Sequence, residues 1–206
     1  MSLRVYGVMM HESNGHHRPK LPDGVQSITV RELSALAEDG DYSAREVGPE
    51  DVARHMDVNR ALFATDSVLP TPVGTVFRSS EVLQRWMELH YVALSDALAW
   101  IEDRSAARVH ITRAHPRHGD EEAGSDLAAV AAEVTRSLRR HAVASVPLRN
   151  EEITGIVLSA GYLIERELFR EFADAVAESR GRHENLRIEL TGPWPPYDFV
   201  RMQFGA

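Results

Sequence analysis

A run of prolines and aromatic residues near the C-terminal end constrains the fold of this chain most strongly. Three prolines and three aromatic residues share the eight positions from 193 to 200: Pro193, Trp194, Pro195, Pro196, Tyr197 and Phe199. Because proline fixes φ and lacks a backbone N–H, the run is excluded from a helix interior and from a central strand. Pro195-Pro196 is expected to be extended, close to polyproline II. Aromatic side chains on a stiff backbone are unfavourable in water, so the run is either a clip that closes the chain's own core or a preformed docking surface.

Size and composition indicate an ordinary globular protein. The chain has 206 residues, of which 43% are hydrophobic and 26% charged, enough for one large domain or two small ones. No apolar run approaches the roughly 20 residues that span a bilayer. The apolar run at residues 5–10 is too short for a signal peptide. We therefore expect a cytoplasmic protein without membrane association.

Charge and cysteine content exclude several classes of function. The chain has no cysteine, which rules out disulfides, thiolate metal sites and cysteine nucleophiles. Its formal net charge of −8 argues against a nucleic-acid partner. The basic patch Arg136, Arg139 and Arg140 lies in a helical pattern and is interpreted as a solvated helix face.

The first part of the chain has the pattern of a small α/β unit. Apolar residues on both alternating sets predict a buried strand at residues 3–10, and a second strand is expected at 25–30. Residues 31–39 fit either a helix or a strand. Pro49 followed by two acids predicts a helix that ends near residue 63. Residues 68–77, broken by prolines and a glycine, are expected to form an extended edge segment that links two halves.

The second part alternates between helical and strand patterns. A helix is expected at 79–103, and further helices at 125–138, capped by Ser125, and at 165–180, ended by Gly181. Strands are expected at 108–114, 153–164 and 186–190. We predict an α+β protein of two α/β subdomains, residues 1–77 and 78–206. The second is a modified ferredoxin-like fold with an extra preceding helix.

The terminal run also resembles a known family signature. Members of the gas vesicle GvpL/GvpF family end in a very similar string, matched here by Gly192, Pro193, Trp194, Pro195, Pro196, Tyr197, Phe199 and Val200. Other family marks are matched by Val5-Tyr6-Gly7-Val8, by Val68-Leu69-Pro70 with Gly74-Thr75-Val76-Phe77, and by the strand at 158–164. The chain departs from the family pattern at Pro72-Val73, where members usually have Arg-Phe. The resemblance implies a strand at 31–39, paired with the one before it.

The resemblance implies a function without catalysis, cofactor or metal. Family members are accessory or minor structural proteins of gas vesicle assembly, located in the cytoplasm and at the gas vesicle. The implied partners are the small hydrophobic shell protein and other accessory proteins. The candidate partner-binding residues are those of the terminal run, Pro193, Trp194, Pro195, Pro196, Tyr197 and Phe199, together with the edge segment 68–77.

Two other classes of function remain as alternatives. Histidines with a nearby acid, as in His11, Glu12, His16 and His17 or His115 and His118, suit a metal-dependent enzyme, but the first cluster lacks the H-E-x-x-H spacing. Ser159 lies in an apolar strand pattern without a G-x-S-x-G motif, which favours a core position. A ferredoxin-like module that binds a small molecule requires a pocket with convergent polar groups, which a sequence does not display.

Overall fold

The computed structural model describes residues 2–10, 21–40, 47–114, 122–149 and 156–200. The chain divides into two compact units, Met1–Glu102 with Pro195–Ala206, and Asp103–Trp194. The boundary expected after residue 77 precedes two helices that this division assigns to the first unit. None of the described helices is long and apolar enough to cross a membrane.

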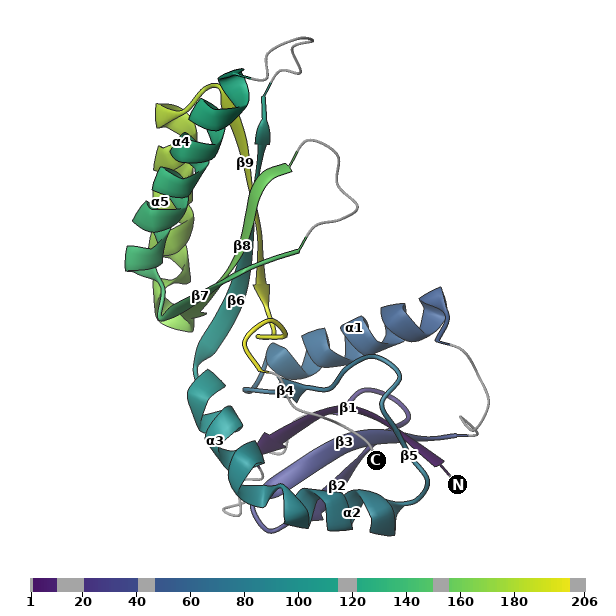
Figure 1. The fold of residues 1–206 in the computed structure, drawn as a ribbon. Coiled ribbons are helices and arrows are strands. Elements are labelled where there is room, and N and C mark those ends of the chain that lie inside the picture. Colours follow the sequence, from purple (N-terminus) through teal and green to yellow (C-terminus); the bar gives the residue numbers. More distant parts are fainter. Residues whose placement is uncertain (1, 11–20, 41–46, 115–121, 150–155, 201–206) are drawn as a thin grey trace. The chain divides into compact units, whose positions relative to one another are not determined.

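The first unit is built on an antiparallel sheet (Figure 1). Its strands are β1 (Ser2–Met10), β2 (Val25–Val30), β3 (Leu33–Gly40), β4 (Leu69–Pro70) and β5 (Val76–Phe77). The order is β2-β3-β1-β4, and β5 also pairs with β1. The strand expected at 31–39 is therefore confirmed: β3 pairs with β2 along its length. The two short strands of the edge segment are confirmed as extended edge pairs.

Helices cover both faces of this sheet, as the apolar residues on both sides of β1 predict. On one face Tyr6 and Met9 pack with Val58 and Leu62 of α1 (Pro49–Phe63). On the other face, Leu3 and Val5 belong to a core that includes apolar side chains of α2 (Ser80–Leu89) and α3 (Tyr91–Ile101): Leu83, Trp86, Met87, Leu94, Leu98 and Ile101. These buried contacts explain why α2 and α3 belong to the first unit.

The single helix expected at 79–103 is wrong, because α2 ends and α3 begins at His90. His90 leaves helical geometry, with φ −106° and ψ 14°. Its ring stacks on Trp86 with centroids 4.6 Å apart, and Nδ1 lies 2.8 Å from the Trp86 carbonyl oxygen. The sequence has no glycine or proline at this position, so helix propensity does not register the break.

The second unit has the element order β-α-β-β-α-β, which is that of ferredoxin-like folds. Its elements are β6 (Arg104–Arg113), α4 (Glu122–Leu138), β7 (Ala144–Pro147), β8 (Ile156–Glu165), α5 (Phe169–Arg182) and β9 (Leu186–Trp194), with short 3₁₀ turns at Arg139–His141 and Arg166–Leu168. The antiparallel sheet has the order β7-β8-β6-β9. The strand β7 was not expected, because four residues ending in proline carry little alternation.

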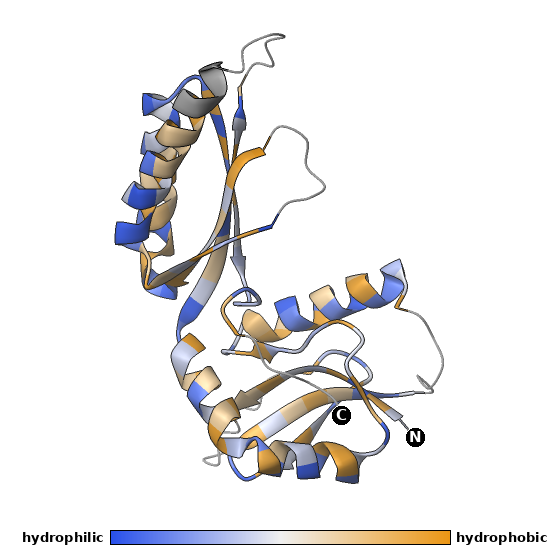
Figure 2. Cartoon of the chain, in the orientation of Figure 1, coloured by the Kyte–Doolittle hydropathy of each residue, from blue (hydrophilic) through white to orange (hydrophobic). Residues whose placement is uncertain are grey.

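Both helices of this unit lie on one face of its sheet, and Figure 2 shows hydrophilic residues along their outer side. Tyr162 of β8 and Phe172 of α5 are fully buried, with ring centroids 5.0 Å apart. Two helix ends differ from expectation. The helix α4 begins before Ser125, so Ser125 does not cap it. The helix α5 continues through Gly181, which does not adopt a positive φ, and ends at Arg182.

Candidate partner-binding site

The terminal run begins as the end of β9, at the edge of the second sheet. Pro193 is exposed there, and Trp194 pairs with Ala106 of β6. Gly192 adopts φ +132°, and a Cβ atom at this position would lie 2.8 Å from the Ala106 carbonyl oxygen. Only glycine fits such a conformation without strain. The sequence thus places proline in a strand where it is tolerated, on an edge beside a register shift.

Trp194 is half-buried and is held locally. Its indole Nε1–H donates to Thr191 Oγ1 at 3.2 Å. This contact fixes one polar atom of the ring, while part of the aromatic surface stays accessible. The position of Trp194 is therefore compatible both with a structural clip and with a docking surface.

The rest of the run forms a turn in the first unit. The Tyr197 N–H donates to the Pro195 carbonyl oxygen at 2.8 Å, and the Phe199 N–H donates to that of Pro196 at 3.1 Å. Pro195 and Pro196 are buried, whereas Tyr197 and Phe199 are half-buried. Val200, which follows, packs against the core of the first unit, and this contact is of the kind that a structural clip requires.

The six predicted site residues are therefore divided between the two units. Pro193 and Trp194 belong to the second unit, and Pro195, Pro196, Tyr197 and Phe199 to the first. The structure does not gather them into one exposed aromatic patch within either unit. Whether they bind a partner remains a prediction.

The edge segment 68–77 is joined to the strand β1 by hydrogen bonds. The β4 residues pair with Gly7 and Val8, and Thr71 donates its hydroxyl to the Val5 carbonyl oxygen at 2.6 Å. The large apolar side chains Val68, Leu69 and Phe77 are buried, while Val73 is exposed. The segment's side toward β1 thus closes the sheet of its own unit.

An exposed apolar surface that was not predicted from the sequence lies where α2 meets α3. The side chains of Leu89 and Val92 are 77% and 69% exposed. Ala93 and Ala99 of α3 are exposed as well, and so is Asp96, which lies one helical turn from Val92 and Ala93. We call Leu89, Val92, Ala93 and Ala99 the α2–α3 surface. The composition of α3 is the sequence signal for this surface. Asp96 is the one charged residue within α3, and a helix that is apolar on all sides is seldom exposed to solvent.

Polar side chains are buried beneath α1. Asp51 forms an ion pair with Arg4 of β1 at 2.9 Å and accepts the Gly48 N–H at 2.9 Å. Asn59 donates to the Tyr6 carbonyl oxygen at 3.0 Å. Tyr6 donates its hydroxyl to Glu38, and burial followed by this carboxylate raises the pKa of Tyr6 to about 12. The contacts of Asp51 and Asn59 join α1 to the strand β1, which indicates a structural role.

The residues weighed for catalysis do not assemble an accessible site in the described part of the chain. Ser159 Oγ lies 2.6 Å from His110 Nδ1 on the neighbouring strand, but Ser159 is only 6% exposed, so a substrate has little access to it. Among the residues that the structure describes, no group of three or more His, Cys, Asp or Glu is placed to hold a metal ion. The histidine clusters at 11–17 and 115–118 lie outside the described residues.

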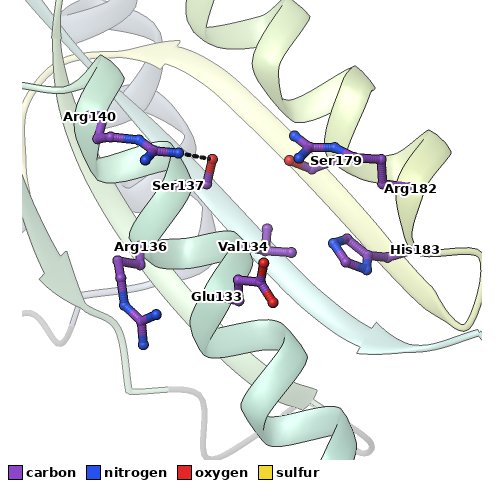
Figure 3. Close-up of a pocket in the computed structure, with 8 residues that line it drawn as sticks. All are labelled: Glu133, Val134, Arg136, Ser137, Arg140, Ser179, Arg182 and His183. Atoms are coloured by element: carbon purple, nitrogen blue, oxygen red, sulfur yellow. Dashed lines mark hydrogen bonds between the residues drawn. The ribbon is translucent and has the colours of Figure 1, made fainter.

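The second unit contains a polar groove between α4 and α5 (Figure 3). Its volume is about 210 Å³, and its lining is rich in basic side chains. Convergent polar groups are what a ligand-binding module requires, so this groove is the feature that favours the small-molecule alternative.

Comparison with known proteins places these features in a family. The chain is 29% identical over 184 residues to gas vesicle protein F2 of Halobacterium salinarum, covering 87% of this chain and 82% of that protein. It is 28% identical over 189 residues to gas vesicle protein F of Haloferax mediterranei, covering 88% and 84%. Both relatives therefore align with nearly the whole chain.

Solved structures share the fold across both units. The crystal structure of gas vesicle protein GvpF from Anabaena sp. PCC7120 superimposes with a TM-score of 0.80 at 17% identity, covering 98% of this chain and 97% of that one. GvpF from Microcystis aeruginosa gives a TM-score of 0.75 at 16% identity, covering 98% and 99%. The model of the family described as gas vesicle synthesis protein GvpL/GvpF matches residues 3–126 and 114–201. Because these matches span almost the entire sequence, the chain belongs to the GvpL/GvpF family.

Proposed function

We propose that this protein is an accessory or minor structural protein of gas vesicle assembly. It acts by contact with the hydrophobic shell protein and with other accessory proteins, at the gas vesicle and in the cytoplasm. The family is one of gas vesicle synthesis proteins, and its model matches both units. The relatives that align with most of the chain are gas vesicle proteins as well.

The α2–α3 surface is the observation that carries the proposal. Leu89 and Val92 project large apolar side chains into solvent beside the junction of two helices. Exposed apolar side chains that cluster on one face mark sites of protein contact. A hydrophobic shell subunit that has not yet assembled presents apolar surface of its own, and burying the two surfaces together stabilises a complex.

The terminal run is a second candidate contact. Trp194 keeps part of its ring accessible, and Tyr197 and Phe199 are half-buried. Large aromatic side chains with accessible faces are frequent anchors of protein interfaces. The contact of Val200 with the first core supports the structural interpretation of the same run, so a variant has to separate the two roles.

Co-expression with the shell protein from the same genome, followed by affinity capture, tests the proposal. The double variant Leu89→Glu, Val92→Glu is expected to capture at least about tenfold less shell protein, because charge at an apolar contact opposes its desolvation. The matched control is Val52→Glu, which makes the same change at an exposed position of α1. Equal capture by the double variant and the wild type would refute the assignment to this surface, and no capture by the folded wild type would refute the proposed function.

Trp194→Ala separates the two roles of the terminal run. If the run docks a partner, capture falls while the melting temperature stays within about 2 °C of the wild type. If the run is a structural clip, the melting temperature falls and any loss of capture follows the unfolded fraction. The two readouts are measured on the same preparation, so one outcome is not mistaken for the other.

A small-molecule-binding role is the second candidate function, and the groove between α4 and α5 favours it. The groove is smaller than the roughly 300 Å³ at which drug-sized ligand pockets begin. It therefore suits a small charged group better than an entire cofactor. This role and the assembly role reside in different units and do not exclude one another.

A further inference from the structure

The groove between α4 and α5 brings basic side chains from two helices to one place. Its volume is about 210 Å³. The lining residues that matter here are Arg140 and Ser137 on one wall, Arg182 and Ser179 on the other, and Glu133 with His183 toward one end. All of them belong to the second unit, so the groove is defined by that unit alone.

The two arginines approach the groove from opposite walls. Figure 3 shows Arg140 and Arg182 extending toward one another across the space between the helices. Arg140 is held in this direction by donating to Ser137 Oγ at 3.1 Å. Arg182 has one acidic neighbour, Glu178, at 3.7 Å, and both of these side chains are more than half exposed. Such an exposed pair contributes little energy and leaves most guanidinium donors of Arg182 available.

Two guanidinium groups that face each other repel unless an anion lies between them. Helix polarity explains part of the basic character, because cations are favoured near the C-terminal ends of helices, where Arg136 and Arg182 lie. It does not explain why Arg140 and Arg182 converge rather than diverge into solvent. Convergence into a shared groove is the arrangement found where arginines bind an oxyanion.

The charge of the surroundings strengthens this argument. The chain as a whole carries a formal charge of −8, yet three arginines line the groove and Glu133 is its one acidic lining residue. A local concentration of positive charge on an acidic protein attracts anions selectively to that place. Ser137 also has a hydroxyl hydrogen to offer, because its oxygen is the acceptor toward Arg140.

We infer that the groove between α4 and α5 binds an oxyanion, a phosphate or carboxylate group, held between Arg140 and Arg182 with the Ser137 hydroxyl as a further donor. Each guanidinium presents paired N–H donors that match two oxygens of such a group. The anion also removes the repulsion between the two arginines. A free inorganic anion and an acidic side chain of a partner protein offer the same chemistry, and the site is distinct from the α2–α3 surface in the other unit.

Titration calorimetry of the full-length protein with inorganic phosphate, in a low-salt chloride buffer, tests the site. The wild type is expected to bind one phosphate per chain with saturation. The variant Arg140→Gln, Arg182→Gln is expected to bind at least about tenfold more weakly, since it loses two charge-assisted contacts. The matched control is Arg139→Gln, which removes the charge of the exposed arginine next to Arg140, a side chain that does not line the groove. Equal weakening by the control would show diffuse attraction only and would overturn the site.

A second titration identifies the source of the oxyanion. A hexaglutamate peptide that binds more tightly than phosphate, and loses its binding in the same double variant, assigns the groove to an acidic segment of a partner. Tighter binding of phosphate assigns it to a free anion. If neither ligand binds with saturation, the inference is wrong. Amide chemical-shift changes at Ser137 and Ser179 of the wild type on adding either ligand provide a readout that needs no variant.

Discussion

At the scale of single residues, His55 shows how burial sets a side chain's behaviour. It lies on the inner side of α1, is 1% exposed, and has its ring 5.7 Å from that of Tyr6. Burial lowers the pKa of His55 below its usual 6.5, and the charge of Arg4 lowers it further, while a backbone contact with Thr71 opposes the shift. The neutral ring is therefore the form that the folded protein accommodates.

This environment makes the free energy of unfolding decrease as the pH decreases. Because the folded-state pKa is depressed, the contribution of His55 is present above about pH 6.5 and is lost as the pH falls through the folded-state pKa. The wild type is expected to lose unfolding free energy between pH 7.5 and pH 5.5, measured by urea denaturation, and His55→Phe is expected to lose less. The exposed His141→Gln serves as control and should keep the wild-type slope. An unchanged slope in His55→Phe would contradict the assignment.

Substitution of glycine by alanine is expected to have opposite effects on stability at two positions of the second unit. Gly192→Ala is expected to destabilise by about 1–3 kcal/mol, because φ is +132° and the new Cβ would meet the Ala106 carbonyl oxygen at 2.8 Å. Gly181→Ala, inside α5 with nothing within 4 Å of the new atom, is expected to stabilise by about 0.5–1 kcal/mol. Thermal unfolding of both variants is the measurement. Equal effects at the two positions would refute the argument from backbone conformation.

At the scale of elements, Asp51 joins the start of α1 to β1. Its carboxylate accepts the Gly48 N–H, which caps the helix, and pairs with Arg4 at 2.9 Å, the two side chains being 6% and 11% exposed. Asp51→Asn removes the carboxylate charge that faces the buried Arg4 guanidinium and is expected to lower the unfolding free energy by about 3 kcal/mol. Asp57→Asn changes an exposed carboxylate of the same helix, 3.5 Å from exposed Arg60, and should change it by less than about 0.5 kcal/mol. Similar losses in both variants would argue against the burial of the pair as the cause.

The elements also show how far the sequence determines the fold. Continuous apolar runs located β1 and β8, alternation located β9, and Pro49 with its acids located α1 to within a residue. The break at His90 falls at a position without glycine or proline, and β7 is too short for a periodic signal. Such features leave no periodic pattern along the chain.

The candidate sites were less predictable for the same reason. The terminal run was conspicuous in the sequence, yet its residues are shared between two units and several are buried. Leu89 and Val92 lie in a stretch with apolar residues on several sides, and such a pattern does not show which side of a helix the sheet covers. Arg140 and Arg182 are far apart in sequence, and only the antiparallel packing of α4 and α5 brings them to one groove.

At the scale of the whole molecule, the second unit has the character of an insertion into the first. It is continuous from Asp103 to Trp194, whereas the first unit contains chain from both sides of it. Its ends lie close together, since Ala106 near the start of β6 pairs with Trp194 at the end of β9. Each unit has its own hydrophobic core, and Val200 completes that of the first. Adjacent termini and a separate core are the properties of a domain that folds independently.

This organisation predicts that the two units, and their two proposed sites, are separable. A fragment of residues 103–194 is expected to fold, as is a chain in which a Gly/Ser linker of about six residues replaces that segment. Circular dichroism and dispersed amide spectra measure folding. The shortened chain should retain capture of the shell protein, because it keeps the α2–α3 surface, and the fragment should retain phosphate binding through Arg140 and Arg182. Capture by the folded fragment instead of the shortened chain would move the assembly contact to the second unit, and unfolding of either piece alone would show that the two cores depend on one another.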